Sequence, residues 1–559
     1  MTRATRTMNA RTTAALGFIL AGPLTTAPSH SAIIIREVAT SGTPAPGIPG
    51  AIFDAVGSPI LNEAGSVLYW ARLRGGFISS TTEDSLWTDR DGSSQLVMLA
   101  GDPSPTNFGD WFTCFPAAAF NDEGRIAVVA TFLGPGVITP TTRMALLRED
   151  AGGALALRAI EAQAAYTLPS LIPMSDSGAG LFRSDLSKDN SVLSFFGPAY
   201  APSTPVPGAG TGNMPPNATF RQFSDPMMNR HGRSVFLAAA GPAAPTTSWL
   251  YAYYTDRVGA LARLATVGDA TPDGPPDRTL AVLASAPAID ASGRIAFWAA
   301  FDDPGVPADL RTAIYLYPPS GPATVIAAAG GAAPGAEPGI FATFSRTVNL
   351  GAGGRAAFRG FLSGEGVTSA NNEGLWIADP LQATRLLVRE GDAVTDASGA
   401  FFSHFGDPYV GPSGQIVFTA SLTGPEVTQS SGYALFASDV NGQIRLIARE
   451  GRPFASSGGV GGTVRRIGFQ SAGPGRAQMN GAGEIAFTLW YYGGASGIYV
   501  AAFPCPADFN DDGGVDGGDV EAFFVAWEAG DEDADINADG GVDGADVEAF
   551  FLLWEAGGC

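Results

Sequence analysis

Short apolar runs recur along residues 32–503, and each follows a four-residue pattern that starts with asparagine or aspartate in most copies and ends with glycine. These residue types suit a type I turn, because glycine can take the positive φ that closes a hairpin. The run that follows, such as IAFWA from Ile295, has too few polar breaks for a half-solvated strand. It predicts a strand buried on both faces. The eight copies have their glycines at Gly65, Gly124, Gly178, Gly232, Gly293, Gly354, Gly414 and Gly483.

The spacing of these glycines, 54 to 69 residues, indicates an internal repeat. In each repeat the hairpin is followed by an apolar strand, a polar turn and another strand that ends in a Gly-Asp type of turn, as in SLWTDRDGSSQLVMLAGD from Ser85. Four short strands in a meander are the make-up of a β-propeller blade. The sequence therefore predicts an all-β repeat domain over residues 32–503.

The two ends of the repeat array predict how a ring would close. The segment AIIIREVATSG from Ala32 has the pattern of the last strand of a unit, whereas the eighth unit ends at GIYVAAF from Gly497 without one. We therefore expect an eight-bladed β-propeller in which the first strand completes the final blade. A seven-bladed ring with a divergent unit, or an open β array, is the alternative, because the third unit around Leu193 departs most from the pattern.

The tail, residues 504–559, contains two nearly identical segments that each pair an acidic loop with an apolar helix pattern. Each loop has oxygen-bearing side chains at positions 1, 3, 5, 9 and 12 and glycine at position 6, which is the ligand spacing of an EF-hand calcium loop. We therefore predict two bound calcium ions. The expected ligands are Asp508, Asn510, Asp512, the carbonyl of Gly514, Asp516 and Asp519 in the first loop, and Asp535, Asn537, Asp539, the carbonyl of Gly541, Asp543 and Asp546 in the second.

Charge is concentrated in this tail, since residues 505–559 contain 16 acidic residues and no lysine or arginine. A solvated acidic linker is the alternative, but apolar stripes such as Val520, Phe523 and Trp527 favour two packed helices. Without the ions the clustered carboxylates would repel one another, so we expect the tail to fold only with calcium bound. The formal net charge of -22 leaves no basic footprint for nucleic acid or an anionic membrane.

Residues 1–31 predict a cleaved signal peptide, because three arginines precede an apolar run over residues 14–24 that ends in small residues around Ser31. The run is too short to span a bilayer, and no other segment is long and apolar enough to do so. We therefore expect a secreted protein, either extracellular or at the cell surface, with the periplasm as the alternative.

Two of the three cysteines, Cys505 and Cys559, bracket the tail. In an oxidising compartment a disulfide between them would tie its ends together, or else Cys559 is a covalent attachment point. The third, Cys114, lies close in sequence to Phe112 and Phe115, and we predict that it is a buried free thiol.

Residues 32–503 contain no recognisable catalytic motif, and their only histidines, His231 and His404, lie in repeats rather than beside a nucleophile motif. Carboxylates recur at turns, as at Asp102, Asp392 and Glu450. Such recurrence favours shaping of turns over catalysis, and we expect no enzymatic activity. The competing hypothesis is a polysaccharide-active hydrolase or lyase, which would need opposed carboxylates and aromatic side chains in the central channel.

The repeat resembles the bacterial tandem-repeat family named for its NxxGxxAF motif, the choice-of-anchor family, over roughly residues 32–503. DASGRIAF from Asp290 and NGAGEIAF from Asn480 carry the resemblance best, whereas Gly351 and Gly411 replace the expected asparagine. The family is defined by its repeats and implies no known catalysis, so the resemblance implies a binding or structural scaffold for a polysaccharide or an extracellular protein.

The paired loop-helix segments and the terminal Gly558-Cys559 resemble a GC-type dockerin. Dockerins dock onto cohesin domains, so the resemblance implies a cohesin-like or cell-surface anchoring partner. Where dockerins of cellulose-degrading complexes often carry hydroxyl residues for cohesin contact, this chain has Gly517-Gly518 and Gly544-Ala545, so the resemblance does not name the partner. We thus expect a signal peptide over residues 1–31, a propeller over 32–503 and a dockerin-like domain over 504–559.

Overall fold

The structure is a computed structural model. It describes residues 33–555 apart from 105–110, 135–142, 151–152, 161–172, 188–189, 196–198, 201–213, 215–216, 242–248, 257–259, 273, 276, 285, 381–382, 413, 439–441, 455–460, 470–477, 504–506, 511–514 and 538–540. The predicted signal peptide and both Cys505 and Cys559 lie outside the described residues. The described chain forms two compact units, the repeat region and the tail.

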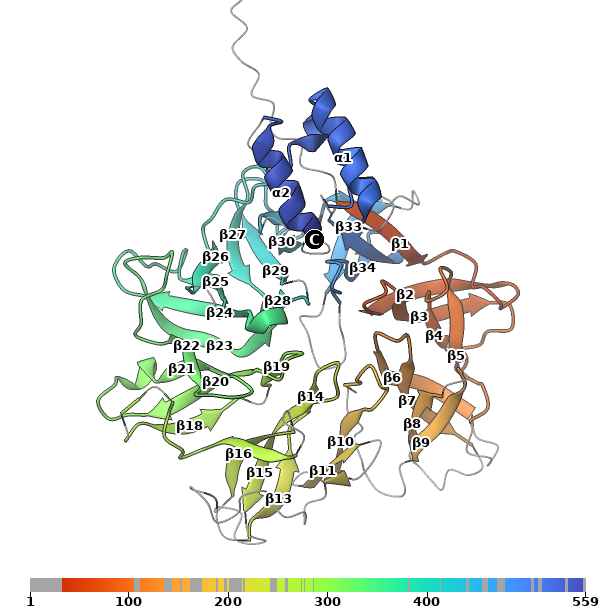
Figure 1. Ribbon diagram of the computed structural model, residues 1–559. Helices are drawn as coiled ribbons and strands as arrows, with labels where there is room; N and C mark the ends of the chain where they lie inside the picture. The colour runs from red at the N-terminus through yellow and green to blue at the C-terminus, as the bar shows by residue number, and fades with distance from the viewer. Residues whose placement is uncertain are drawn as a thin grey trace, which may run out of the picture. The chain divides into compact units, whose positions relative to one another are not determined.

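The described part of the repeat region forms eight antiparallel sheets that follow one another around a ring, in a β-propeller arrangement (Figure 1). The first sheet contains β2 (Ala51–Leu61), β3 (Val67–Gly75), β4 (Asp84–Thr88) and β5 (Gln95–Leu99). The second contains β6 (Trp111–Phe120), β7 (Ile126–Leu133), β8 (Arg143–Glu149) and β9 (Leu155–Ile160). The third contains β10 (Leu181–Ser187), β11 (Asn190–Phe195) and β12 (Ala199–Tyr200). The fourth contains β13 (Thr219–Phe223), β14 (Met227–Met228), β15 (Ser234–Gly241), β16 (Leu250–Thr255) and β17 (Ala262–Thr266).

The remaining sheets complete the ring. The fifth contains β18 (Thr279–Leu283), β19 (Ala288–Ile289), β20 (Ile295–Asp302), β21 (Thr312–Tyr317) and β22 (Thr324–Ala328). The sixth contains β23 (Ile340–Leu350), β24 (Ala356–Ser363), β25 (Glu373–Ala378) and β26 (Arg385–Arg389). The seventh contains β27 (Phe401–Phe405), β28 (Tyr409–Val410), β29 (Ile416–Thr423), β30 (Tyr433–Ser438) and β31 (Ile444–Arg449). The closing sheet contains β32 (Pro453–Phe454), β33 (Gly462–Gly468), β34 (Ile485–Tyr491), β35 (Ser496–Ala502) and β1 (Ile34–Thr40), and the short 3-10 helices η2 (Ala308–Leu310) and η3 (Ala352–Gly354) lie in connections.

The ring closes by pairing the first strand of the described chain with the last. β1 lies antiparallel to β35, from Ile34 opposite Ala502 to Thr40 opposite Gly497. This confirms the prediction that the first strand completes the final sheet. Seven sheets have four or five strands, as a propeller blade requires, whereas the third has three strands among its described residues and comes from the most divergent repeat.

The predicted turns are present in all eight repeats. The fourth-position glycines have φ between 74 and 87°, and each donates its N–H to the carbonyl of the first residue of its turn. The copies that start with Gly351 and Gly411 make the same turn, because the backbone alone supplies these hydrogen bonds. The strands that follow are buried on both faces, as β15 shows with every residue buried.

An asparagine at the first position of the turn also joins neighbouring repeats. Its Oδ1 accepts the N–H of the residue four positions on, and its Nδ2 donates to the carbonyl that holds the same position in the next repeat. All four such asparagines are buried. We call them the asparagine ladder: Asn62 donates to Asn121 O (3.4 Å), Asn121 to Ser175 O (2.9 Å), Asn229 to Asp290 O (2.8 Å) and Asn480 to Asn62 O (3.3 Å).

Apolar clusters fill the space between neighbouring sheets. One joins the fourth and fifth sheets, where the rings of Tyr253 and Phe297 lie 4.6 Å apart. Another joins the closing sheet to the first sheet. The core is therefore a series of layers around the ring, and each layer forms only when two sheets are present.

The tail contains α1 (Gly517–Ala529), the 3-10 helix η4 (Glu532–Ala534) and α2 (Gly544–Glu555). Phe523 and Phe550 are fully buried and stack with their centroids 4.2 Å apart and their planes 1° apart. Within the described ranges, no helix has the length and apolar character needed to cross a membrane.

The asparagine ladder can be tested at Asn229, because other repeats carry natural replacements. Asn229→Ala removes both the turn cap and the donor to the next repeat, and should lower the free energy of unfolding by about 2 kcal/mol. Asn229→Ser should keep the cap, as Ser175 does for Ala179 N, and lower it by about 1 kcal/mol. Urea denaturation followed by far-ultraviolet circular dichroism measures both. The control His231→Ala changes an exposed side chain of the same turn and should have no effect; a serine variant as stable as the parent would contradict the ladder.

Candidate functional site

In the first tail loop, the structure brings predicted ligands at positions 3, 9 and 12 together. Asp519 is fully buried, and its carboxylate accepts the backbone N–H groups of Asn510 (3.2 Å) and Asp516 (2.7 Å). Asp516 caps α1 by accepting the N–H of Gly518 at 2.7 Å. Asp508 is half-buried next to them in the chain, whereas Asp512 and Gly514 lie outside the described residues.

The second loop repeats this geometry. Asp546 is fully buried and accepts the backbone N–H groups of Asn537 (3.1 Å) and Asp543 (2.8 Å). Asp543 in turn accepts the N–H of Ala545 at 2.8 Å. Asp535 and Gly541 are also described, and Asp539 lies outside the described residues.

Each loop is held by the helix that follows the other loop. The indole of Trp527 donates to Asp543 O at 2.8 Å, and the indole of Trp554 donates to Asp516 O at 2.9 Å. Both acceptors are the position-9 residues of their loops, so the two halves make reciprocal contacts. The geometry of one loop therefore depends on the folding of both.

Four of the five candidate residues of the repeat region considered next have a side-chain contact. Cys114 is a free, half-buried thiol whose Sγ lies 2.9 Å from Thr131 Oγ1. His231 is exposed, and His404 Nδ1 lies 2.6 Å from the buried carboxylate of Glu373 in the neighbouring sheet. Asp102 and Asp392 accept backbone N–H groups within their own turns, at 3.0 and 2.7 Å. These two carboxylates shape turns, as predicted.

Three carboxylates at the second position of the turns form a group that sequence reasoning missed. Glu63, Asp122 and Asp176 hold the second position of the turns in the first three repeats, and we call them the inner carboxylates. Glu63 Oε2 accepts the N–H of Gly481 at 2.6 Å, and Asp122 Oδ1 accepts the N–H of Glu63 at 3.3 Å. The only sequence signal is acidic character at one repeat position in three successive copies.

Burial and mutual repulsion perturb these acids. Burial raises the pKa of Asp176 to about 6, helped by the charge of Asp122 and a hydrogen bond with it, and opposed by Arg230. Because Asp122 and Asp176 hydrogen-bond directly, no sugar ring fits between them, whereas glycosidase carboxylates stand about 5 Å or more apart. The pair Asp122 and Asp176 therefore lacks the spacing of a glycosidase pair.

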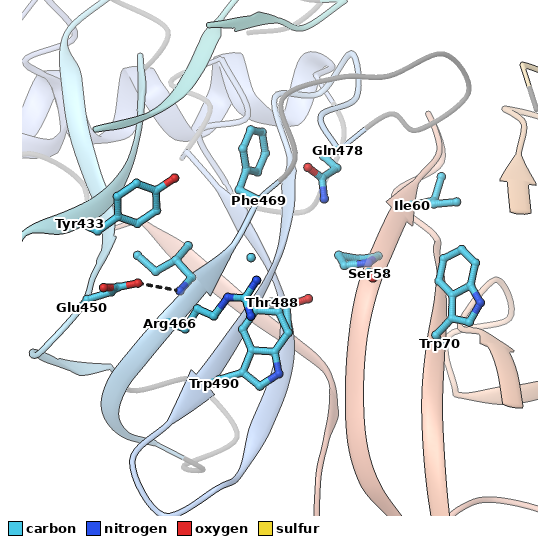
Figure 2. Close-up of a pocket in the computed structure, with 13 residues that line it drawn as sticks. Ser58, Ile60, Trp70, Tyr433, Glu450, Arg466, Phe469, Gln478, Thr488 and Trp490 are labelled. Atoms are coloured by element: carbon cyan, nitrogen blue, oxygen red, sulfur yellow. Dashed lines mark hydrogen bonds between the residues drawn. The ribbon is translucent and has the colours of Figure 1, made fainter. Parts of the chain in front are cut away.

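A pocket of about 530 Å³ lies where the ring closes, between the seventh, closing and first sheets (Figure 2). Its walls combine aromatic rings with hydrogen-bonding groups. Burial raises the pKa of the Glu450 carboxyl, which accepts the N–H of Ile467 at 3.3 Å. Glu450 thus lines a cavity as well as following a turn. We call this the closure pocket; the lining side chains the argument uses are Trp70, Tyr433, Glu450, Arg466, Thr488 and Trp490.

The ring of sheets and its apolar layers define a β-propeller protein with a small helical tail. The chain belongs to the Family of unknown function (DUF7453), whose sequence profile matches residues 3–165, 203–322 and 312–509. No curated protein matches the chain.

Several solved structures are similar at low identity. An acylaminoacyl peptidase from Pyrococcus horikoshii is 12% identical with a TM-score of 0.34, over 89% of this chain and 71% of that one. A Trypanosoma rangeli sialidase is 10% identical with a TM-score of 0.25, over 70% and 56%. A Penicillium chrysogenum α-L-arabinanase complexed with arabinobiose is 8% identical with a TM-score of 0.25, over 73% and 99%. We draw no conclusion about activity from these likenesses.

The raised pKa of Asp176 predicts a pH-dependent stability. Its folded pKa of about 6 exceeds the ordinary value of 3.8, so the stability it contributes is fully present below pH 3.8 and is lost as the pH rises through 6. Asp176→Asn removes this loss. The melting temperature of the variant minus that of the parent should therefore be more positive at pH 7.5 than at pH 4.5. Thermal melts at both values measure the difference. The exposed control Asp309→Asn should show no such rise, and an equal offset for Asp176→Asn at both pH values would contradict the assignment.

Proposed function

We propose that this chain is a secreted β-propeller binding protein that is anchored or assembled through a calcium-loaded, dockerin-like tail. The observation that carries the proposal is the burial of Asp519 and Asp546 in a tail segment without any lysine or arginine. A buried carboxylate without a cationic partner is costly, even when backbone N–H groups solvate it. A bound cation would remove that cost.

The donor set favours calcium over a transition metal. The tail loops offer carboxylate, amide and carbonyl oxygens and no histidine, and calcium accepts six to eight such oxygens in flexible geometry. Each ion would be held by the six ligands predicted for its loop. The ion supplies positive charge among the acids, while the helix caps at Asp516 and Asp543 and the reciprocal tryptophan contacts orient the loops.

For the propeller, we propose eight blades, with the third sheet as a thin blade. The turn of the third repeat takes part in the asparagine ladder, because Asn121 donates to the carbonyls of Ser175 and Asp176. Leu181 of β10 packs with the core of the fourth sheet, and Met174 packs with the second. These contacts support a place for the third repeat between two full blades.

The propeller is proposed to bind rather than to catalyse. Among the described residues, Asp122 and Asp176 contact each other, and Glu63 Oε2 is engaged by a backbone N–H, so the inner carboxylates do not support the hydrolase or lyase alternative. The ligand would be a polysaccharide or an extracellular protein. The tail would then hold the propeller at a cell surface or on a cohesin-like partner, with a Cys505–Cys559 disulfide tying its ends.

Calcium binding is tested by calorimetry on the full chain. The parent should bind two ions, Asp508→Ala one, and the double variant Asp508→Ala/Asp535→Ala none, because each change removes the first ligand of one loop. Chelation should also reduce the helical signal in circular dichroism. The control Asp531→Asn alters an exposed acid outside the predicted ligand positions and should still bind two ions. A parent that binds no calcium, or a control that loses as much as Asp508→Ala, would refute the assignment.

A further inference from the structure

We infer that the closure pocket binds a neutral oligosaccharide. The inference rests on the proposed binding function of the propeller and adds the site and the chemical class of the ligand. A pocket of about 530 Å³ is large enough for a sugar residue with its substituents. Four features of its walls support this ligand.

The aromatic wall is built into the fold. Trp490 of β34 lies against the backbone of Gly468 in β33, where an added Cβ would stand 2.6 Å from the indole Cζ3. Glycine at this position therefore makes room for the ring. The Arg466 guanidinium lies over the indole with its central carbon 5.0 Å from the ring centroid, within the roughly 6 Å of a cation–π contact. This stacking orders the guanidinium beside the pocket.

The polar wall has an unmet hydrogen bond. Thr488 is 1% exposed, lines the pocket, and its Oγ1 has no hydrogen-bond partner among the described residues. A buried hydroxyl without a partner is costly, so a ligand hydroxyl that reached Oγ1 would supply the missing hydrogen bond. In Figure 2, Thr488 lies between Trp490 and Ser58, within the group of lining residues.

The first sheet has an irregular strand at the edge of the pocket. A register shift in β2 between Gly57 and Ile60 puts Ser58 at a φ of 55°, in the left-handed region that favours glycine. Strain of this kind is concentrated at binding sites. Ser58 and Trp70 also line a second pocket of about 390 Å³, and the Trp70 indole is fixed by donating to Phe115 O at 2.7 Å. Two adjoining cavities that share a fixed tryptophan fit a chain of sugars better than a single ring.

The charges of the two cavities favour a neutral ligand. The closure pocket has one acid, Glu450, and one base, Arg466, and the second pocket has one of each in Asp84 and Arg72. The lining of each cavity therefore has no net formal charge, so neither cavity favours a charged ligand. Sugar hydroxyls donate and accept at once, which matches an acceptor carboxylate, a donor guanidinium and the Thr488 hydroxyl, while the apolar faces of the sugar rings pack on tryptophan.

The test begins with the calcium-loaded full chain on an array of neutral, uronate-containing and sulfated oligosaccharides, with unglycosylated peptides included. Isothermal titration with the strongest neutral sugar then compares two variants. Thr488→Val and Glu450→Gln should each weaken affinity at least tenfold, and Thr488→Val should leave the melting temperature unchanged or raised, since its hydroxyl has no partner among the residues that the structure describes. The matched control is Thr266→Val, which removes another buried, unpartnered hydroxyl outside either pocket and should bind within twofold of the parent.

The outcomes separate the inference from the proposed function. Neutral sugars that bind equally well to parent and pocket variants would overturn the site but leave a binding propeller. Binding confined to acidic sugars or peptides, or no binding at all, would overturn the ligand class, and calcium titration of the same sample reports independently on the tail. Release of shortened sugars during the titration would instead overturn the proposal of a non-catalytic binding protein.

Discussion

Four of the joints between neighbouring repeats depend on a buried asparagine side chain that hydrogen-bonds in two directions. The side-chain oxygen accepts a backbone N–H within the turn of its own repeat, and the side-chain nitrogen donates to the turn of the next repeat. One amide group therefore stabilises both the local turn and the packing of neighbouring repeats. Asn480 makes this contact with Asn62, across a separation of 418 residues. The motif that marks the repeat in sequence is thus also the joint between repeats.

Much of the fold could be predicted because its determinants are local. A glycine that must take positive φ and a strand without polar breaks are visible in any single copy, as at Gly293 and Ile295. The pairing of β1 with β35 could be predicted because each end of the array was visibly incomplete. The donation from the asparagine amide could not, because the acceptor is a backbone carbonyl that carries no sequence signature and lies 54 to 61 residues away within the array.

The two candidate sites also differ in how far the sequence could predict them. The tail loops are continuous segments, so the order of their ligands is visible in the sequence, and the structure adds the reciprocal contacts of Trp527 and Trp554. The closure pocket combines Ser58, Glu450 and Trp490 from distant segments, and recurrence at turns hid the position of Glu450. The contact between Asp122 and Asp176 was also missed, because the two residues lie in different repeats. Repetition therefore predicts architecture well and hides the places where one copy has acquired a different role.

The pairing of β1 with β35 also has a kinetic consequence. Contacts between residues so far apart in sequence pay more loop-closure entropy than local hairpins, so we expect them to form after the hairpins. The closure pocket takes its walls from the closing sheet and from β2 and β3, so it does not exist until this last seam is sealed. A chain emerging from synthesis would therefore gain this pocket only on completing the whole ring, and an incompletely folded molecule would be unable to bind the proposed ligand.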